Sequence, residues 1–291
     1  MKGALLKMWL VGMGFITLSG CMNYADCGNG TLEYESLDVS FKATLPLLYN
    51  LNDDMFFGAC GTCTRDGETG VNMSSVPVSR MGHASSSPYY FYSQTDEDAI
   101  VGVKGDHNYN FYAYYPYDPS CSDMAAIPVD IPSVITYDAD APALAPLIVA
   151  KNNVTSIIAP VLMKFYAPAS CQMTLRIPET ACDVLKSIEI YPGSSNWKGR
   201  FAFTGTYDIY TGELTEKKET VSKSITIDFG PAGYDMQPGY LTVSFLMGEA
   251  AYVNGGVWMK LTDINGVTVS KEIYNARQTF DAGSSYTYTM K

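Results

Sequence analysis

Cysteines are the residues of this chain with the most chemistry open to them, and the first of the seven stands in a distinctive context. Cys21 follows a basic start, an apolar stretch over residues 8–17 and the sequence Leu18-Ser19-Gly20. This pattern is a bacterial lipobox, which predicts that residues 1–20 are a cleaved signal peptide. Cys21 then becomes the mature N-terminus, and acyl chains on its thiol and amine anchor the protein to a membrane. An ordinary secretion signal followed by a chance cysteine is the alternative.

The other six cysteines form an even set in an exported chain, which favours disulfide bonds. Cys171 and Cys182 flank an extended segment that is followed by a proline turn, so we predict a local disulfide between them. The remaining four leave three pairings open. They are Cys27, Cys60, Cys63 and Cys121.

The sequence around these cysteines favours redox or zinc chemistry less than it favours disulfide bonds. Cys60 and Cys63 have the spacing of a redox pair, but they lie in a loop rich in Gly, Thr and Asp rather than at the start of a helix. Zinc binding by the four unassigned cysteines lacks a second pair at the matching spacing.

No other set of residues has the pattern of a catalytic or metal-binding site. His83 and His107 are the only histidines, and neither has a partner at metal-ligand spacing. Nucleophile-elbow and His-Glu-x-x-His motifs are missing from the sequence. The net charge of −11 argues against nucleic acid as a partner. We therefore predict a protein that is not an enzyme and has no cofactor and no metal.

Aromatic residues suggest a different kind of site, one that stacks on sugar rings. Trp197 lies in a polar segment, and an exposed tryptophan usually has a binding role, so it is the candidate contact for a host or other glycan. Folding of Trp197 back onto a sheet is the alternative. Tyrosines crowd residues 89–92 and 109–117, but half of those on a strand must point inward because successive side chains face opposite sides.

The elements that hold these residues are predicted to be strands. From Leu37 onward apolar residues alternate with polar ones, and Gly, Pro, Asn and Asp interrupt the pattern at short intervals, which indicates an all-β protein. Asn265-Gly266 between two such runs predicts a hairpin. A stretch rich in Pro and Ala over residues 131–160 suggests a boundary near Asn152. We expect β-sandwich domains at 21–152 and 153–291.

Four segments carry a resemblance to a known family. Residues 109–117, YNFYAYYPY, resemble the F-x-A-Y-Y-P-Y signature of fimbrillin-like proteins, which are pilin and pilus-associated lipoproteins of Gram-negative anaerobes. Residues 145–150 and 161–167 resemble the strands that precede and open the second domain of that family. Residues 280–290 are similar to its terminal strand.

The resemblance implies two tandem transthyretin-like β-sandwich domains and a lipoprotein on the surface of the outer membrane. In that family a trypsin-like protease cuts after Arg or Lys in an early loop, the first strand leaves, and a strand of another fimbrillin-like subunit fills the groove. Residues 38–43 would be the strand lost here. Arg65 is the first candidate for the cut and Arg80 the second.

A role as subunit or anchor of a pilus-like adhesin by strand exchange is therefore the main hypothesis. The alternative is a glycan-binding surface lipoprotein of a nutrient-uptake system, which would use Trp197 and exposed tyrosines.

Overall fold

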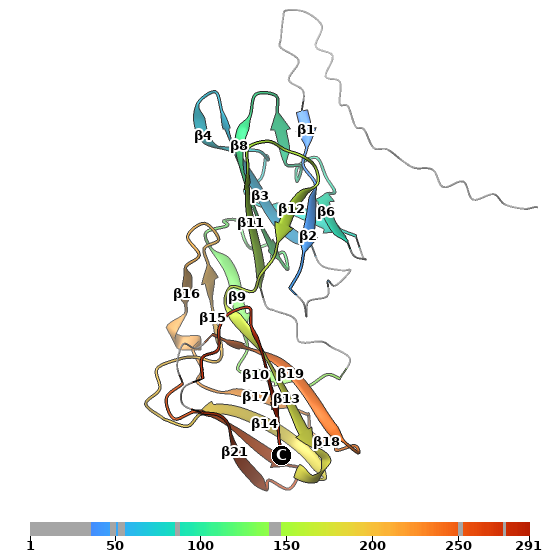
Figure 1. Ribbon diagram of the computed structural model, residues 1–291, viewed down its shortest axis with the longest axis vertical. Coiled ribbons are helices and arrows are strands. Elements are labelled where there is room, and N and C mark those ends of the chain that lie inside the picture. The colour runs from blue at the N-terminus through green and yellow to red at the C-terminus, as the bar shows by residue number, and fades with distance from the viewer. Residues whose placement is uncertain are drawn as a thin grey trace, which may run out of the picture. The chain divides into compact units, whose positions relative to one another are not determined.

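Figure 1 shows a computed structural model of the chain. It describes residues 36–46, 51, 56–84, 88–139, 147–249, 253–275 and 278–291. Cys21 and Cys27 lie outside the described residues. All described strands belong to one unit, Glu35–Lys291. Helix among the described residues is limited to two 3-10 turns, η1 (Glu179–Ala181) and η2 (Lys218–Thr220), and no described helix has the length and apolar character to cross a membrane. The all-β prediction is confirmed.

The largest sheet holds eight strands in the order β11-β8-β3-β5-β6-β2-β12, with β4 paired to β3. A separate ladder joins β1 and β7. The bounds of these strands are β1 (Ser36–Asp38), β2 (Phe41–Thr44), β3 (Phe57–Arg65), β4 (Glu68–Asn72), β5 (Ser79–His83), β6 (Tyr89–Ser93), β7 (Val101–Val103), β8 (His107–Tyr115), β11 (Ile148–Val154) and β12 (Val161–Lys164).

Three further sheets contain the remaining strands. One has the order β10-β17-β14-β20-β21 with β18 paired to β14, and the others are β19-β13-β22 and β16-β15-β9. The bounds are β9 (Ile127–Ile131), β10 (Val134–Thr136), β13 (Ser170–Pro178), β14 (Val184–Pro192), β15 (Phe203–Tyr207), β16 (Leu214–Glu216), β17 (Ile225–Asp228), β18 (Tyr234–Asp235), β19 (Tyr240–Gly248), β20 (Val257–Asp263), β21 (Thr268–Tyr274) and β22 (Ser285–Thr289).

Alternation of side chains explains why these sequences form strands. In β2, β12 and β15 every second residue is buried, as expected for strands with one face against a core. The predicted Asn265-Gly266 hairpin is confirmed between β20 and β21, where Gly266 has a φ of 82°. Only a residue that tolerates positive φ fits this turn, which explains the glycine.

Two clusters of buried side chains stabilise the fold. The first core gathers phenylalanines from the largest sheet, among them Phe41, Phe57, Phe91 and Phe111. The second core holds apolar residues of the sheets that contain β13, β14 and β15. Burial of large aromatic and aliphatic side chains makes the main favourable contribution to the free energy of folding.

The path of the chain connects the two cores more than once. β9 pairs with β15 and β10 pairs with β17, so both join strands that come much later in the sequence. β11 then pairs with β8, and β12 pairs with β2, which returns the chain to the largest sheet. Neither core is therefore built from one continuous stretch, and the predicted division at residue 152, which falls within β11, stays a prediction.

Candidate functional site

The N-terminal strand β2 sits inside the largest sheet, although it is one of the first described elements of the chain (Figure 1). It pairs antiparallel with β6 on one side and parallel with β12 on the other. We call the space between β6 and β12 that β2 occupies the β2 slot. Because neither neighbour of β2 adjoins it in sequence, removal of β2 would leave two rows of unpaired backbone groups facing each other.

Phe41 is the residue that fixes β2 in the β2 slot. Its ring is fully buried and lies parallel to Phe91, with 4.7 Å between ring centroids. Phe111 meets it edge-on at 5.4 Å. Val39 and Ala43 are buried on the same side of the strand. The β2 slot therefore selects an extended segment with apolar residues at alternate positions and an aromatic ring in the middle.

The segment that connects β2 to β3 offers no site to a protease that cuts after basic residues. Residues 45–56 contain neither Lys nor Arg. The nearest basic residue before them, Lys42, lies within β2, and the nearest after them is Arg65 at the end of β3. A trypsin-like enzyme would have to attack a bond inside a strand or next to one.

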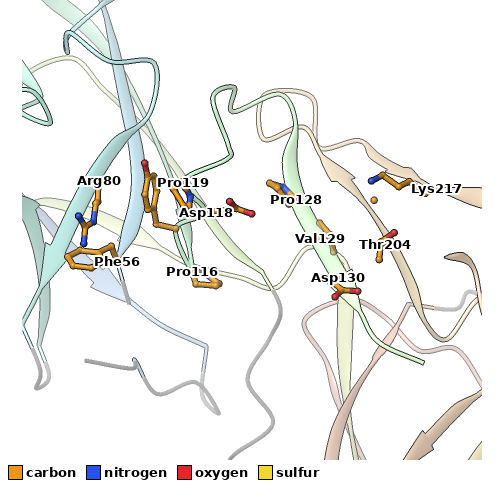
Figure 2. A pocket seen from close by; sticks show the side chains of 12 residues that line it. Phe56, Arg80, Pro116, Asp118, Pro119, Pro128, Val129, Asp130, Thr204 and Lys217 are labelled. Atoms are coloured by element: carbon orange, nitrogen blue, oxygen red, sulfur yellow. The ribbon is translucent and has the colours of Figure 1, made fainter. Parts of the chain in front are cut away.

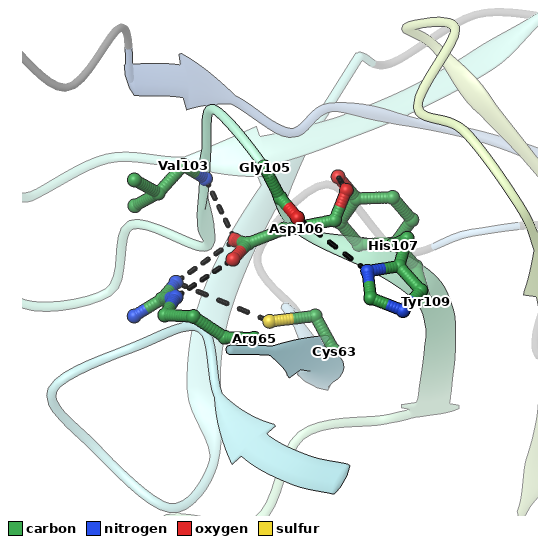
Figure 3. Close-up of polar contacts among 7 residues, drawn as sticks. All are labelled: Cys63, Arg65, Val103, Gly105, Asp106, His107 and Tyr109. Carbon is green, nitrogen blue, oxygen red and sulfur yellow. Dashed lines mark hydrogen bonds and ion pairs between the residues drawn. The ribbon is translucent and has the colours of Figure 1, made fainter. Parts of the chain in front are cut away.

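Arg65 is held in place by a buried carboxylate (Figure 3). Its Nε and Nη2 atoms donate to the two oxygens of Asp106 at 2.7 and 2.8 Å. The Asp106 side chain is 0% exposed and also accepts a hydrogen bond from the Val103 amide. The hydrogen bond from Arg65 lowers the pKa of Asp106 to about 2. A bidentate pair of this kind fixes both side chains and the ends of β3 and β8.

The polar loop predicted around Arg65 is instead a tight hairpin. β3 continues through Arg65, which lies opposite Glu68 of β4. Asp66 and Gly67 form the two-residue turn with φ values of 51° and 83°, the geometry of a type I′ hairpin. A cut after Arg65 would also separate β3 from the chain, and β3 lies between β8 and β5 in the sheet. Cleavage there stays a prediction, and the geometry does not favour it.

Replacing Asp106 with Asn should reveal what this ion pair contributes to stability. Because the folded pKa of Asp106 is lowered to about 2, the pair stabilises the protein above the ordinary carboxyl pKa of about 4, and the stabilisation is lost as the pH falls toward 2. Urea unfolding should show Asp106→Asn less stable by about 2 kcal/mol at neutral pH. The difference should shrink near pH 2. The exposed Asp96→Asn serves as control, and an Asp106→Asn protein as stable as the wild type at neutral pH would contradict this assignment.

Arg80, the second candidate for cleavage, lies within β5 beside a groove of about 900 Å³ (Figure 2). Its guanidinium stacks on the ring of Phe56, 3.6 Å from the centroid. The groove is also lined by Asp118, Asp130 and Lys217. Two cations and two carboxylates at one groove give it no preference for a ligand of either charge. The position of Arg80 in a paired strand does not favour cleavage.

The predicted disulfide between Cys171 and Cys182 is wrong in this structure, where both are free thiols. Seven residue steps along strand β13 lead from Cys171 to Pro178, about 23 Å at about 3.3 Å per step. The four residue steps from Pro178 to Cys182 span at most about 14 Å. At least about 9 Å therefore remains between the two Cα atoms, more than the ~7 Å that a disulfide allows.

The other described cysteines are also free and buried. Cys60 and Cys63 stand three residues apart on β3, so their side chains point to opposite faces, Cys60 into the second core and Cys63 into the first. Burial raises the pKa of Cys60 to about 11 and that of Cys171 to about 12. Protonated, buried thiols are poor nucleophiles and metal ligands. Among the described residues no group of His, Cys, Asp and Glu could hold a metal ion.

Trp197 is buried, which corrects its assignment as an exposed glycan contact. The indole is 6% exposed and packs on the ring of Phe201 with 4.7 Å between centroids. Gly199 leaves room for it, because a Cβ atom at that position would come within 1.9 Å of the indole. Trp197 therefore folds back onto the protein, as the alternative predicted.

Comparisons with known proteins place this arrangement in a family. A family model described as fimbrillin-like matches residues 79–291. A proposed cell adhesion protein from Bacteroides uniformis has a similar structure, with a TM-score of 0.56 and 18% identity over 87% of this chain and 93% of that one. A proposed cell adhesion protein from Bacteroides ovatus gives a TM-score of 0.58 and 15% identity over 88% and 92%. At these identities the two structures show a shared fold. No curated protein sequence is significantly similar. The family match covers well over half of the chain, and this protein belongs to the fimbrillin-like family.

Proposed function

We propose that this protein is a lipid-anchored surface component of a pilus-like adhesin and that it joins other fimbrillin-like subunits by strand exchange. The observation that carries the proposal is the position of β2, an N-terminal strand inserted between β6 and β12. A strand in this position is held by the sheet and not by its neighbours in sequence. A strand from another subunit could satisfy the same backbone groups.

We further propose that this chain acts as an anchor rather than as a released subunit. An anchor keeps its own β2 strand in the β2 slot, and with it the link to lipid on Cys21, so it would supply a strand to another subunit rather than accept one. The lack of Lys and Arg in residues 45–56 supports this role, because the connection that would have to be cut offers no basic residue. The positions of Arg65 and Arg80 in paired strands support it as well. No enzymatic activity is part of the proposal.

Limited proteolysis with trypsin tests the anchor role. The wild-type protein should keep residues 36–64 attached, as measured by intact mass after gel filtration. In the variant Asp53→Arg the same connection carries a basic residue and should be cut there. The cut variant should then form oligomers, because its β2 strand is no longer tied to the subunit and another strand can replace it.

A matched variant, Asp53→Asn, separates the effect of the new cleavage site from the loss of a carboxylate and should behave like the wild type. Release of a fragment that ends at Arg65 or Arg80 from the wild-type protein would overturn the anchor role. A cut Asp53→Arg protein that stays monomeric would argue against strand exchange.

The nutrient-uptake alternative loses its main support with the burial of Trp197. Its second support, exposed tyrosines, remains at Tyr90 and Tyr92 of the largest sheet.

A further inference from the structure

The outer surface of four neighbouring strands carries a row of exposed side chains. In β12, β2, β6 and β5 the residues that alternate with the buried ones point away from the first core. Strand pairing places Leu162 opposite Lys42, and Lys42 opposite Tyr90. Tyr92 lies opposite Gly82 in β5. We call the outer surface of these four strands the tyrosine face.

Two aromatic rings of the tyrosine face are open to solvent. Tyr90 is 37% exposed and Tyr92 is 45% exposed. They stand on the same side of β6, about 7 Å apart along the strand, because one residue separates them. Leu162 adds an exposed aliphatic side chain two strands away. Exposed apolar side chains grouped on neighbouring strands mark a binding site more often than scattered ones do.

The tyrosine face is positively charged in an acidic protein. Its four strands contain Lys42, Lys164 and Arg80 and no Asp or Glu, whereas the whole chain has a net charge of −11. None of the three cations forms an ion pair with a carboxylate among the residues that the structure describes.

The Lys42 ammonium and the Arg80 guanidinium each contact an aromatic ring. The ammonium of Lys42 lies 5.9 Å from the centroid of the Tyr90 ring. Asp98, in the loop after β6, accepts hydrogen bonds from the Arg80 amide and the Thr95 hydroxyl, not from the Arg80 guanidinium. Lys42 and Lys164 therefore keep donors for an anionic ligand, whereas Arg80 lies at the groove that it shares with Asp118 and Asp130.

We propose that the tyrosine face binds a polysaccharide that carries carboxylates. Sugar rings would pack their apolar faces on Tyr90 and Tyr92, while the carboxylates pair with Lys42 and Lys164. Charge complementarity selects an anion, and the two exposed rings select a ligand with flat apolar surfaces, which a simple polyanion lacks. The inference goes beyond strand exchange and does not depend on it, although β2 supplies Lys42 and completes the face.

Binding of polygalacturonate to the full mature chain with Cys21 replaced by Ala tests this inference by calorimetry. Polyglutamate carries the charge without the sugar rings, and dextran carries the rings without the charge. Polygalacturonate should bind at least about tenfold more tightly than either. Its affinity should fall as salt is added, because the paired charges are exposed.

Tyr92→Ala and Lys164→Gln should each weaken the binding of polygalacturonate several-fold without changing thermal unfolding. Tyr240→Ala is the matched control, since Tyr240 is 48% exposed and lies 5.0 Å from the Arg176 guanidinium, but on β19 in another sheet. This control should bind like the wild type.

Three results would overturn the inference. They are no binding of polygalacturonate, equal binding of polyglutamate, and binding that the Tyr240→Ala change weakens as much as Tyr92→Ala. Anionic lipid vesicles that bind through Tyr92 and Lys164 more tightly than polygalacturonate would identify the face as a membrane contact and would also overturn it.

Discussion

Replacing Phe41 with Ala is expected to lower the free energy of unfolding by about 3–5 kcal/mol, because the ring is fully buried and the surrounding residues cannot close the space it leaves. Phe91 would lose one of its two stacked partners, at 4.7 Å, and Phe111 would lose its edge contact at 5.4 Å. Chemical denaturation monitored by tyrosine fluorescence measures the change. The effect should be among the largest of any single substitution in β2, since Phe41 is its largest buried side chain.

Thr44→Ala is the matched control for this substitution, because Thr44 ends the same strand and is exposed. It should change the free energy of unfolding by less than about 0.5 kcal/mol. If Phe41→Ala proved as mild as Thr44→Ala, β2 would not be packed as described, and the β2 slot would not select an aromatic residue.

Replacing Cys21 with Ala should move the protein from the membrane fraction to the soluble fraction. In the anchor that we propose, lipid on this cysteine holds the protein. Each buried methylene of an acyl chain contributes about 0.8 kcal/mol to membrane binding, so loss of the chains would remove the whole attachment. The folded part of the chain should be unaffected, since β1 begins 15 residues later, at Ser36. Fractionation of cells followed by immunoblotting measures the distribution.

Cys27→Ala distinguishes lipidation from a general effect of losing an N-terminal thiol, and this variant should remain with the membranes. A Cys21→Ala protein that still sediments with membranes would contradict lipid anchoring.

Strand positions could be predicted from the sequence where alternation is clean, and they could not where glycine and cysteine interrupt it. β3 was missed because Gly58, Cys60 and Gly61 are poor signals for a strand. In the structure Gly58 is required, since a Cβ atom there would come within 2.2 Å of the Tyr114 ring on the neighbouring strand β8. The requirement for glycine at position 58 becomes visible only once β3 is known to pair with β8.

The partners of polar groups could not be predicted, because they depend on which strands meet. Asp106 was not among the candidate residues, although it holds Arg65, and no local pattern links the two. The error at Cys171 and Cys182 has the same origin. Their short separation in sequence suggested a closed loop, whereas a long paired strand keeps them apart.

Burial of aromatic residues was predicted only in part. Alternation correctly implied that half of the tyrosines on a strand point inward, and β6 exposes Tyr90 and Tyr92 while burying Phe91. It could not show that β6 and β2 are neighbours, which places Lys42 beside Tyr90. Trp197, in an irregular segment, gave no such periodic signal.

Exchange of a labelled peptide into the β2 slot tests strand exchange most directly. A specific protease site inserted between residues 51 and 56 allows β2 to be cut from the body of the protein, and fluorescence anisotropy then follows a labelled peptide of residues 36–46. We predict that the peptide enters the cut protein but not the uncut protein, and that a Phe41→Ala peptide binds about 100-fold more weakly or worse. A cut protein that takes up neither peptide, or both equally well, would contradict a strand-selective β2 slot.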